Sequence, residues 1–471
     1  MKVTFFLPSS LDKNKTGPIL EHIQYALDNN DEVTVLICGK AIKTCSVNPI
    51  GNPLICFACL NNFDRLIEKF ELLQKVTVLK LDSFCEDSYQ LNDCNFNTLE
   101  DFQNAYWDDK KLDVGWSIVS TFVSATRDIS NKLNTKNIKR LNQNYLDCIK
   151  VYEKIKSFLK AHHPDRVMIF NGRLFETRAV LRGCQTLNVH CDVLEIAAFE
   201  GRNWNIYPNA LPHDLNVYSQ KLIDTWKGEL DELKRQKVGA RFYELRKSGA
   251  KTNDKSHVGG QNRDLLPENF DVTKKNIVVF NSSEDEIFSI GPEWRKEFTS
   301  QEAGVIAISE LLEGNSDYHL YLRIHPNLIG VKSQFLFDLL ELDRKSNITI
   351  IPPESPISSY KLLENASKVV TFGSTIGVEA TYWGKPSMTL SDCFYSKIGA
   401  AYTIFDYNLR DFLFKNLISK DTDVALKYGF YQMAAGEKFK YWKGDHFRKT
   451  KIPNPNLFEK LAYHTYRILN G

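Results

Sequence analysis

The sequence predicts an α/β fold of two doubly wound, Rossmann-like domains that face a central cleft. Apolar runs alternate with segments of helical periodicity in both halves of the chain, and a polar, glycine-bearing stretch at 248–269 separates the two series. A chain of 471 residues is also too long for one compact core. We therefore expect an N-terminal domain at 1–250, a C-terminal domain at 270–430 and a final segment at 431–471.

The first domain begins as strand, helix and strand, at 3–7, 19–27 and 32–38. A unit of this length indicates parallel strands joined by a right-handed crossover. Apolar runs at 76–81 and 166–170 add further strands to the same sheet. The long polar-apolar stretch between them, 99–159, predicts a helical insertion that caps this domain.

The second domain alternates more regularly. Strands are expected at 276–280, 320–324, 348–351, 368–372 and 387–390, and helices at 301–312, 333–342, 358–365 and 375–383. Open parallel sheets bind ligands outside the carboxyl ends of their strands, so the chemistry of the protein should lie in the residues that follow each strand.

Composition excludes several function classes. Sixty basic residues against 58 acidic ones give a net charge of +2, which argues against a nucleic-acid partner. No run approaches the roughly 20 apolar residues of a membrane-spanning helix, and 1–8 reads as a first strand and not as a signal peptide. Ten cysteines without an export signal are typical of reduced thiols, which predicts a cytoplasmic location.

The strongest motif is the segment 371–380, in which an apolar strand ends at Gly373 and is followed by Ser374, Thr375 and Glu379. The glycine allows a sharp turn, and the two hydroxyls open a helix whose free amides suit a phosphate. Glu379, four residues after Thr375, lies on the same helical face and can accept hydrogen bonds from sugar hydroxyls. The structural alternative makes Ser374 a helix cap and Glu379 a solvated residue.

Two further strand ends of the second domain carry polar residues. Arg323 and His325 project to one face of a strand, and Pro326 fixes His325 at the carboxyl edge, where both can bind a phosphate. A histidine bonded to backbone is the alternative. Ser282 and Ser283 follow another strand and either line the same ligand site or belong to an ordinary loop.

The first domain should supply the acceptor side. Its strand ends and loops carry Asn171, Arg173 and Glu195, and then Glu200 and His213. Asn171 and Arg173 are expected to contact the acceptor. Glu200 or His213 is the candidate general base that removes a proton from an acceptor hydroxyl, and the sequence does not choose between them.

Four cysteines lie within 22 residues, at Cys38, Cys45, Cys56 and Cys59. Four thiolates can bind zinc tetrahedrally, and the closing two-residue spacing is that of a zinc knuckle. The competing interpretation is reduced thiols packed under a loop. A structural zinc is thus one expectation, whereas no metal is expected in catalysis.

Three segments of the second domain together resemble the capsule polysaccharide biosynthesis glycosyltransferases. They are the run from Arg323 to Pro326, the Ser374-Thr375 turn with Glu379, and the closing Gly384-Lys385-Pro386. Members of that family with an assigned activity include Kdo transferases of the GT-B fold. The resemblance implies that His325, Ser374 and Thr375 hold the phosphate of a cytidine monophosphate (CMP) sugar.

The expected activity is therefore transfer of a sugar, Kdo or another acidic sugar on a CMP-linked donor, onto a surface polysaccharide or lipid-linked glycan. No cofactor is expected to be required for this transfer. The same pattern also resembles the polymerases that transfer glycerol phosphate from cytidine diphosphate (CDP) glycerol, which makes alditol phosphate transfer the second alternative. A catalytically silent binding subunit is the third.

The final segment is basic and aromatic. Part of it, around 457–469, has helical spacing and is expected to pack back on the first domain. Lys438, Lys440, Tyr441, Trp442 and Lys443 could contact an anionic membrane at its inner face, where lipid-linked acceptors are found, or form a solvated basic face.

Overall fold

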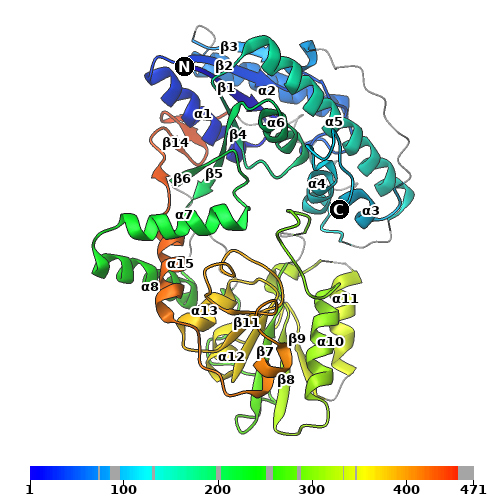
Figure 1. Ribbon diagram of the computed structural model, residues 1–471, viewed down its shortest axis with the longest axis vertical. Coiled ribbons are helices and arrows are strands. Elements are labelled where there is room, and N and C mark those ends of the chain that lie inside the picture. The colour runs from blue at the N-terminus through cyan, green and yellow to red at the C-terminus, as the bar shows by residue number, and fades with distance from the viewer. Residues whose placement is uncertain are drawn as a thin grey trace.

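The computed structural model of the chain consists of two α/β halves stacked along its long axis, with a group of helices between them (Figure 1). The structure describes residues 1–72, 75–84, 96–129, 133–197, 203–250, 258–283, 288–331, 334–344 and 347–453. Each half is organised around its own sheet, which is where the candidate site residues are placed.

The first half is built on a seven-stranded sheet of order β13-β6-β5-β4-β1-β2-β3. Its strands before the chain leaves this half are β1 (Lys2–Leu7), β2 (Glu32–Ile37), β3 (Thr77–Lys80), β4 (Arg166–Phe170), β5 (His190–Ala197) and β6 (Asn203–Pro208). β1 to β5 pair in parallel, whereas β6 runs antiparallel to β5. All strand ends from β1 to β5 therefore meet at one edge.

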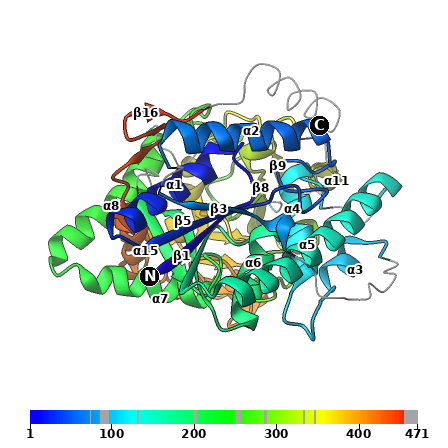
Figure 2. The ribbon, with the colours of Figure 1, turned by 90° about the horizontal axis from the view of Figure 1, so that it is seen from above.

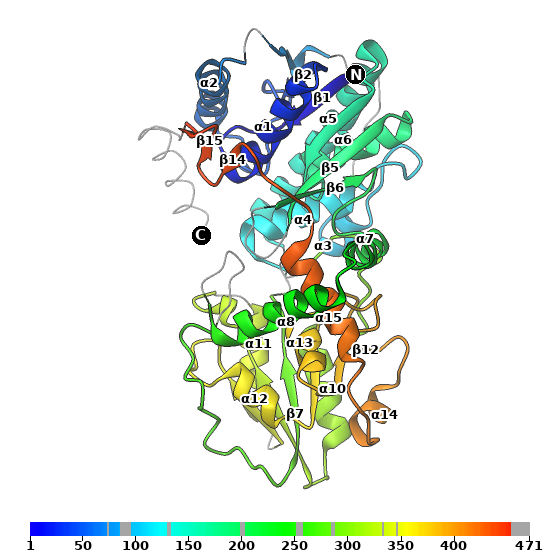
Figure 3. The same ribbon diagram turned by 90° about the vertical axis from the view of Figure 1, so that its left-hand side faces the viewer.

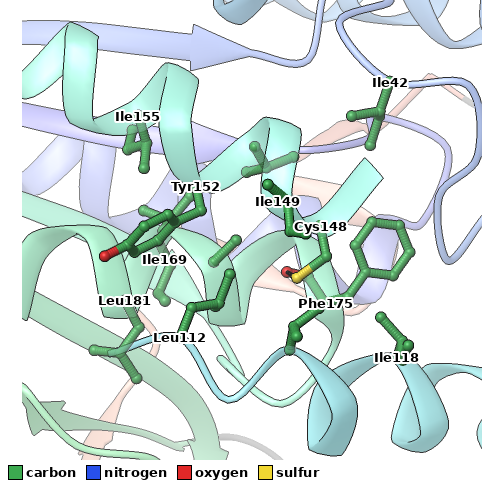
Figure 4. Packing of buried hydrophobic residues seen from close by; sticks show 14 of the residues in the cluster. Ile42, Leu112, Ile118, Cys148, Ile149, Tyr152, Ile155, Ile169, Phe175 and Leu181 are labelled. Atoms are coloured by element: carbon green, nitrogen blue, oxygen red, sulfur yellow. Dashed lines mark hydrogen bonds between the residues drawn. The ribbon is translucent and has the colours of Figure 1, made fainter. Parts of the chain in front are cut away.

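Helices cover both faces of this sheet (Figure 2). They are α1 (Lys13–Asp28), α2 (Pro53–Lys69), α3 (Leu99–Gln103), α4 (Val114–Thr126), α5 (Thr135–His162) and α6 (Phe175–Thr186). Side chains alternate across the sheet, so Phe5 packs with α1 and α2 and Phe6 packs with α4 to α6. The predicted helical insertion is α3 to α5, and Cys148 of α5 lies in the core among Ile118, Ile149 and Phe175 (Figure 4).

The second half contains a six-stranded sheet of order β12-β11-β10-β7-β8-β9, parallel throughout. Its strands are β7 (Lys275–Phe280), β8 (Tyr318–Arg323), β9 (Ile348–Ile351), β10 (Lys368–Thr371), β11 (Ser387–Thr389) and β12 (Tyr402–Thr403). Its helices are α10 (Gln301–Leu312), α11 (Gln334–Glu341), α12 (Ser359–Asn365), α13 (Ile376–Tyr382) and α14 (Leu409–Phe414). Short 3-10 helices lie at Pro326–Leu328 and Leu342–Arg344 in this half, and another lies at Leu81–Ser83 in the first half.

Three helices, α7 (Leu215–Gly228), α8 (Glu232–Ser248) and α15 (Thr422–Ala434), lie between the two sheets (Figure 3). α8 packs on α15 at two glycines. A β-carbon on Gly239 would come within 2.5 Å of the Leu426 carbonyl oxygen, and one on Gly429 within 2.4 Å of the Gly239 oxygen. Tyr243 adds a hydrogen bond from its hydroxyl to the Ala425 carbonyl at 2.6 Å. The helix axes approach this closely only because both positions lack a side chain.

After α15 the chain returns to the first half. β13 (Glu437–Lys438) pairs with β6, and a small antiparallel sheet of β14 (Trp442–Lys443), β15 (His446–Phe447) and β16 (Thr450–Lys451) packs beside α1. The buried Glu21 carboxylate accepts hydrogen bonds from the backbone N–H groups of residues 440, 441 and 442 at 2.6–2.8 Å. The helix expected at 457–469 lies outside the described residues.

This packing corrects one expectation. The Trp442 side chain is 5% exposed and lies over Gly17 in the core of the first half, so its ring cannot contact a membrane. Lys438, Lys440 and Lys443 remain exposed. None of the helices in the described ranges combines the length and apolar character needed to cross a membrane.

The predicted fold class is confirmed. Two Rossmann-like sheets, a helical insertion in the first half and a chain that crosses between the halves twice make up a GT-B-like architecture.

We expect Gly239→Ala to destabilise the protein by about 1–3 kcal/mol, because the new methyl group forces α8 and α15 apart. Urea unfolding followed by circular dichroism measures this change. Gly228→Ala is the matched control, since no atom lies within 4 Å of its β-carbon position. Equal stability of the two variants would contradict the role given to the α8–α15 contact.

Candidate functional site

The strand order of the second sheet creates a topological switch point between β7 and β10. The chain runs outward from β7 through β8 and β9, and then returns to add β10, β11 and β12 on the other side. Ligands of open α/β sheets bind in the crevice at such a point, outside the carboxyl ends of the strands.

A cavity lies at this point, and we call it the basic cavity. Its lining includes three cationic or ionisable basic side chains, one acidic side chain, one phenol and two hydroxyls. These residues are Arg246, Arg323, His325, Glu379, Tyr360, Ser374 and Thr375. The structure thus brings together five of the residues that the sequence nominated on separate strands and one helix, namely Arg323, His325, Ser374, Thr375 and Glu379.

His325 is half-buried and held at both its backbone and its ring. Its N–H donates to Asn281 Oδ1 at 2.7 Å, and its Nδ1 accepts from the Asn327 N–H at 3.1 Å. Because Nδ1 is an acceptor, the proton of the neutral ring resides on Nε2. The ring is therefore oriented to present an N–H donor.

Arg323 is 1% exposed, and its guanidinium group binds the backbone carbonyls of Pro352 and, at 3.2 Å, Ser355. Burial lowers the pKa of Arg323 to about 10, which leaves the group charged at neutral pH. Arg323 thus braces the loop after β9 and contributes positive charge to the cavity wall.

The turn after β10 requires glycine. Gly373 has φ +93°, and a β-carbon there would lie 3.2 Å from Cys393 Cβ. Thr375 precedes α13 without making a side-chain cap, and α13 is only seven residues long. The hydroxyls of Ser374 and Thr375, more than a long helix dipole, are the donors that this turn offers.

Glu379 is 1% exposed and both of its carboxylate oxygens are bonded. Oε1 accepts from Arg246 Nε at 3.0 Å, and Oε2 accepts from the Tyr360 hydroxyl. Arg246 also donates from Nη2 to Thr375 Oγ1 at 3.0 Å. Glu379 therefore fixes an arginine from α8 against the turn that follows β10.

Ser282 and Ser283 have other partners. The Ser282 hydroxyl donates to the Phe372 carbonyl at 2.8 Å and ties the ends of β7 and β10 together, while Ser283 Oγ accepts from Asn327 Nδ2 at 3.0 Å. Within the described part of the chain, Asn281 and not these serines lines the basic cavity after β7.

The carboxyl edge of the first sheet carries an amide–carboxylate pair. Asn171, which follows β4 with φ +65°, donates from Nδ2 to Glu195 Oε2 at 2.5 Å. Burial raises the pKa of Glu195, while Asn171, Arg173 and Lys15 act in the opposite direction. Arg173 donates to Ser120 Oγ at 2.9 Å and Ser124 Oγ at 3.0 Å, and so connects this edge to α4.

Glu200 and His213 are the two residues that the sequence suggests as general bases. Glu200 lies outside the described residues. His213 is half-buried beside Trp294, whose Nε1 donates to the His213 carbonyl at 2.9 Å. Burial lowers the pKa of His213 to about 3, with Arg173 and Arg178 acting in the same direction. Such an imidazole is neutral at pH 7 but is a weak proton acceptor.

The halves also meet at a connecting segment after β7. Ser289 Oγ donates to the Trp116 carbonyl at 2.9 Å, and Arg178 Nη2 donates to the Ile290 carbonyl at 3.3 Å. Arg178 is buried and paired with Asp113, together with Arg182. Although burial opposes it, this pairing holds the pKa of Asp113 well below its usual value.

The four clustered cysteines all lie among the described residues as free thiols. No group of three or more His, Cys, Asp or Glu side chains that could hold a metal is found among the described residues, which include all four thiols. Burial raises the pKa of Cys38 to about 11 and that of Cys45 well above its usual value, which disfavours the thiolate form of both side chains. The four thiols line one cavity, and the structural zinc expected from their spacing stays a prediction.

Sequence reasoning missed Arg246, Tyr360 and Asn281. Arg246 lies 129 residues before Thr375, on a helix whose other features indicate only a basic last turn. Asn281 directly follows β7, and a rule that takes the first polar residue after each strand would have found it.

No protein-family model matches the chain, and no curated protein matches it. Two solved structures similar to the chain are KpsC proteins of Thermosulfurimonas dismutans. The β-Kdo 2,4-transferase is 13% identical with a TM-score of 0.37, and covers 57% of this chain and 80% of its own. The β-Kdo 2,7-transferase is 14% identical with a TM-score of 0.36, and covers 72% and 98%. The UDP-GlcNAc 2-epimerase of Methanocaldococcus jannaschii is 13% identical with a TM-score of 0.25, and covers 100% and 99%.

We expect Arg246→Met to destabilise the fold by about 3–5 kcal/mol, because it leaves the buried Glu379 carboxylate without its cation. The double variant Arg246→Met/Glu379→Gln should recover part of this loss. Urea unfolding measures both. Lys247→Met is the control on the same helix, since its ion pair with Glu364 is 38% and 41% exposed and should contribute less than about 1 kcal/mol. An Arg246→Met variant as stable as the control would refute the pairing.

Proposed function

We propose that the protein transfers a sugar from a nucleotide-activated donor to a hydroxyl of a surface polysaccharide or lipid-linked glycan. The observation that carries this proposal is the basic cavity at the switch point of the second sheet. Its cations and donors suit a phosphate, and its position is the one at which doubly wound sheets bind nucleotides.

The phosphate of the donor would be bound by His325 Nε2, Arg246 and the hydroxyls of Ser374 and Thr375. Negative charge on the phosphate grows as the bond to the sugar breaks, so fixed donors at this position stabilise the transition state more than the ground state. Glu379 then has a positioning role, because its oxygens are occupied by Arg246 and Tyr360.

For the donor we propose a CMP-linked acidic sugar, of which Kdo is one. The basic cavity holds two guanidinium groups and an imidazole against one carboxylate. A donor of this class carries a phosphate and a sugar carboxylate, and the excess of basic over acidic side chains in the cavity favours such an anionic ligand.

Glu195 is our candidate for the proton acceptor. It lies at the carboxyl edge of the opposite sheet, where an acceptor hydroxyl would have to be deprotonated, and Asn171 fixes its orientation. A raised pKa brings a carboxylate closer to the pH at which it must accept a proton.

We expect His325→Ala to bind CMP about 10–100 times more weakly, since one hydrogen-bond donor to the phosphate is lost. Calorimetric titration measures the affinity, and a thermal melt verifies the fold. His319→Ala is the matched control, because His319 lies at the opposite end of the same strand and bonds Thr349. The assignment fails if the two variants bind CMP equally well.

Transfer itself distinguishes the candidate activities. CMP-Kdo, CDP-glycerol and UDP-GlcNAc are each supplied with glycan acceptors, and the added mass on the acceptor is measured. A Kdo increment supports the proposal, whereas a glycerol phosphate increment identifies an alditol phosphotransferase. Nucleotide binding without any transfer identifies a silent subunit.

We expect Glu195→Gln to lower kcat about 10²–10⁴-fold with unchanged CMP affinity, because only the proton acceptor is removed. In the unmodified protein the active form is the carboxylate, so kcat/KM falls as pH falls through the raised pKa of Glu195. The exposed Glu32, at the amino end of β2, provides the control Glu32→Gln. Retained activity in Glu195→Gln would move the role to another group.

A further inference from the structure

A second cavity opens at the carboxyl ends of β1 and β2, separate from the basic cavity. It lies between the loop after β1, the loop after β2 and helix α2. Cys38, Cys45, Cys56 and Cys59 all line it, together with apolar side chains such as Ile42 and Phe63. We call it the thiol cavity.

The polar groups of its wall bond to one another. The Ser10 hydroxyl donates to the Cys59 carbonyl at 2.6 Å, and the Ser10 N–H donates to Cys59 Sγ at 3.4 Å. Asn48 Nδ2 donates to the Asn52 carbonyl at 2.9 Å and to Cys56 Sγ at 3.2 Å. The inner surface therefore presents hydrocarbon and sulfur, which favour an apolar occupant.

The loop that forms one wall is held in place by two buried carboxylates. Asp147 accepts from the backbone N–H groups of Lys43 at 3.0 Å and Thr44 at 2.8 Å, and Glu176 accepts from the Ser46 N–H at 2.5 Å. Both acids are thus engaged with backbone and do not line the cavity. The wall is preformed, which lowers the entropy cost of binding.

Two cationic side chains belong to the wall of the cavity. Lys40 and Lys43 line the cavity with exposed side chains, and neither has an ion-pair partner among the described residues. In the loop before α2 and in α2 itself, Ile50, Leu54 and Phe57 are 44%, 52% and 58% exposed. A positive rim next to an apolar interior complements a molecule with an anionic head and an alkyl chain.

We propose that the thiol cavity binds an anionic amphiphile, with its alkyl chain among the four thiols and its head group at Lys40 and Lys43. This binding is independent of sugar transfer, and its test needs no turnover.

The test uses decyl phosphate, below its micelle concentration, with the full chain. Calorimetry should show saturable binding of one molecule per chain. Octyl phosphate, with two CH₂ groups fewer, should bind about fifteenfold more weakly, since each buried CH₂ changes affinity about fourfold. Decyl phosphate should also slow alkylation of Cys56 and Cys59 by N-ethylmaleimide, which peptide mass mapping reads residue by residue. Cys393, buried in the second half, is the internal reference.

Substitutions at two places test the alkyl chain and the head group of the ligand separately. Cys56→Trp fills the cavity and should abolish binding, whereas Glu68→Trp, on the exposed face of the same helix, should not. Lys40→Glu/Lys43→Glu alters only exposed side chains and should weaken decyl phosphate at least about tenfold, because both cations of the rim are reversed. This pair keeps the test decisive if Cys56→Trp does not fold.

Three results would overturn the proposal. They are no saturable binding of decyl phosphate, equal affinity for ethyl and decyl phosphate, and stoichiometric zinc that alone protects Cys56 and Cys59. CMP binding to the basic cavity is measured in the same samples, so failure of one site is not mistaken for failure of the other.

Discussion

The arrangement of the two halves depends on the contact between α8 and α15 at Gly239 and Gly429. The first helix carries the chain out of the first half and the second carries it back, so their separation sets the distance between the two sheets. It also sets the reach of Arg246, which lies two turns after Gly239 on α8 and enters the basic cavity from there. A residue larger than glycine at either position would move a cavity wall as well as a domain boundary.

The basic cavity is consequently a product of the crossing helices as much as of the sheet. Arg246 comes from α8, whereas Glu379, Thr375 and Tyr360, which hold it, come from the second half. The affinity of a ligand phosphate for Arg246 would therefore depend on the relative position of the two halves. The connecting segment at Ser289 and Ile290, bonded to Trp116 and Arg178, limits how far that position can change without breaking buried hydrogen bonds.

Much of the fold followed from periodicity, because parallel strands buried on both faces are continuous apolar runs that stand out in the sequence. The strand ends at His325 and Ser374 followed from the same signal. Arg246 did not, since its partners are more than 100 residues away and a basic residue late in a helix is common. The membrane-contact prediction for Trp442 was wrong for a related reason. An aromatic residue among lysines is typical of a segment at a membrane surface, and the sequence does not show that the Trp442 ring packs over Gly17. The cysteine spacing suggested zinc, but spacing does not determine whether sulfur atoms converge.

The return of the chain has a consequence for biosynthesis. Phe439, Trp442, Phe447 and Ile452 complete the core of the first half, and β13 pairs with its edge strand β6. All of them leave the ribosome after the second half, 229 residues beyond β6 when counted from Pro208 to Glu437. At the usual pace of translation, the first half waits roughly ten to fifty seconds with part of the core beside α1 uncovered and the edge strand β6 unpaired. Exposed apolar surface and an unpaired strand edge make such an intermediate prone to aggregation until the last segment is made.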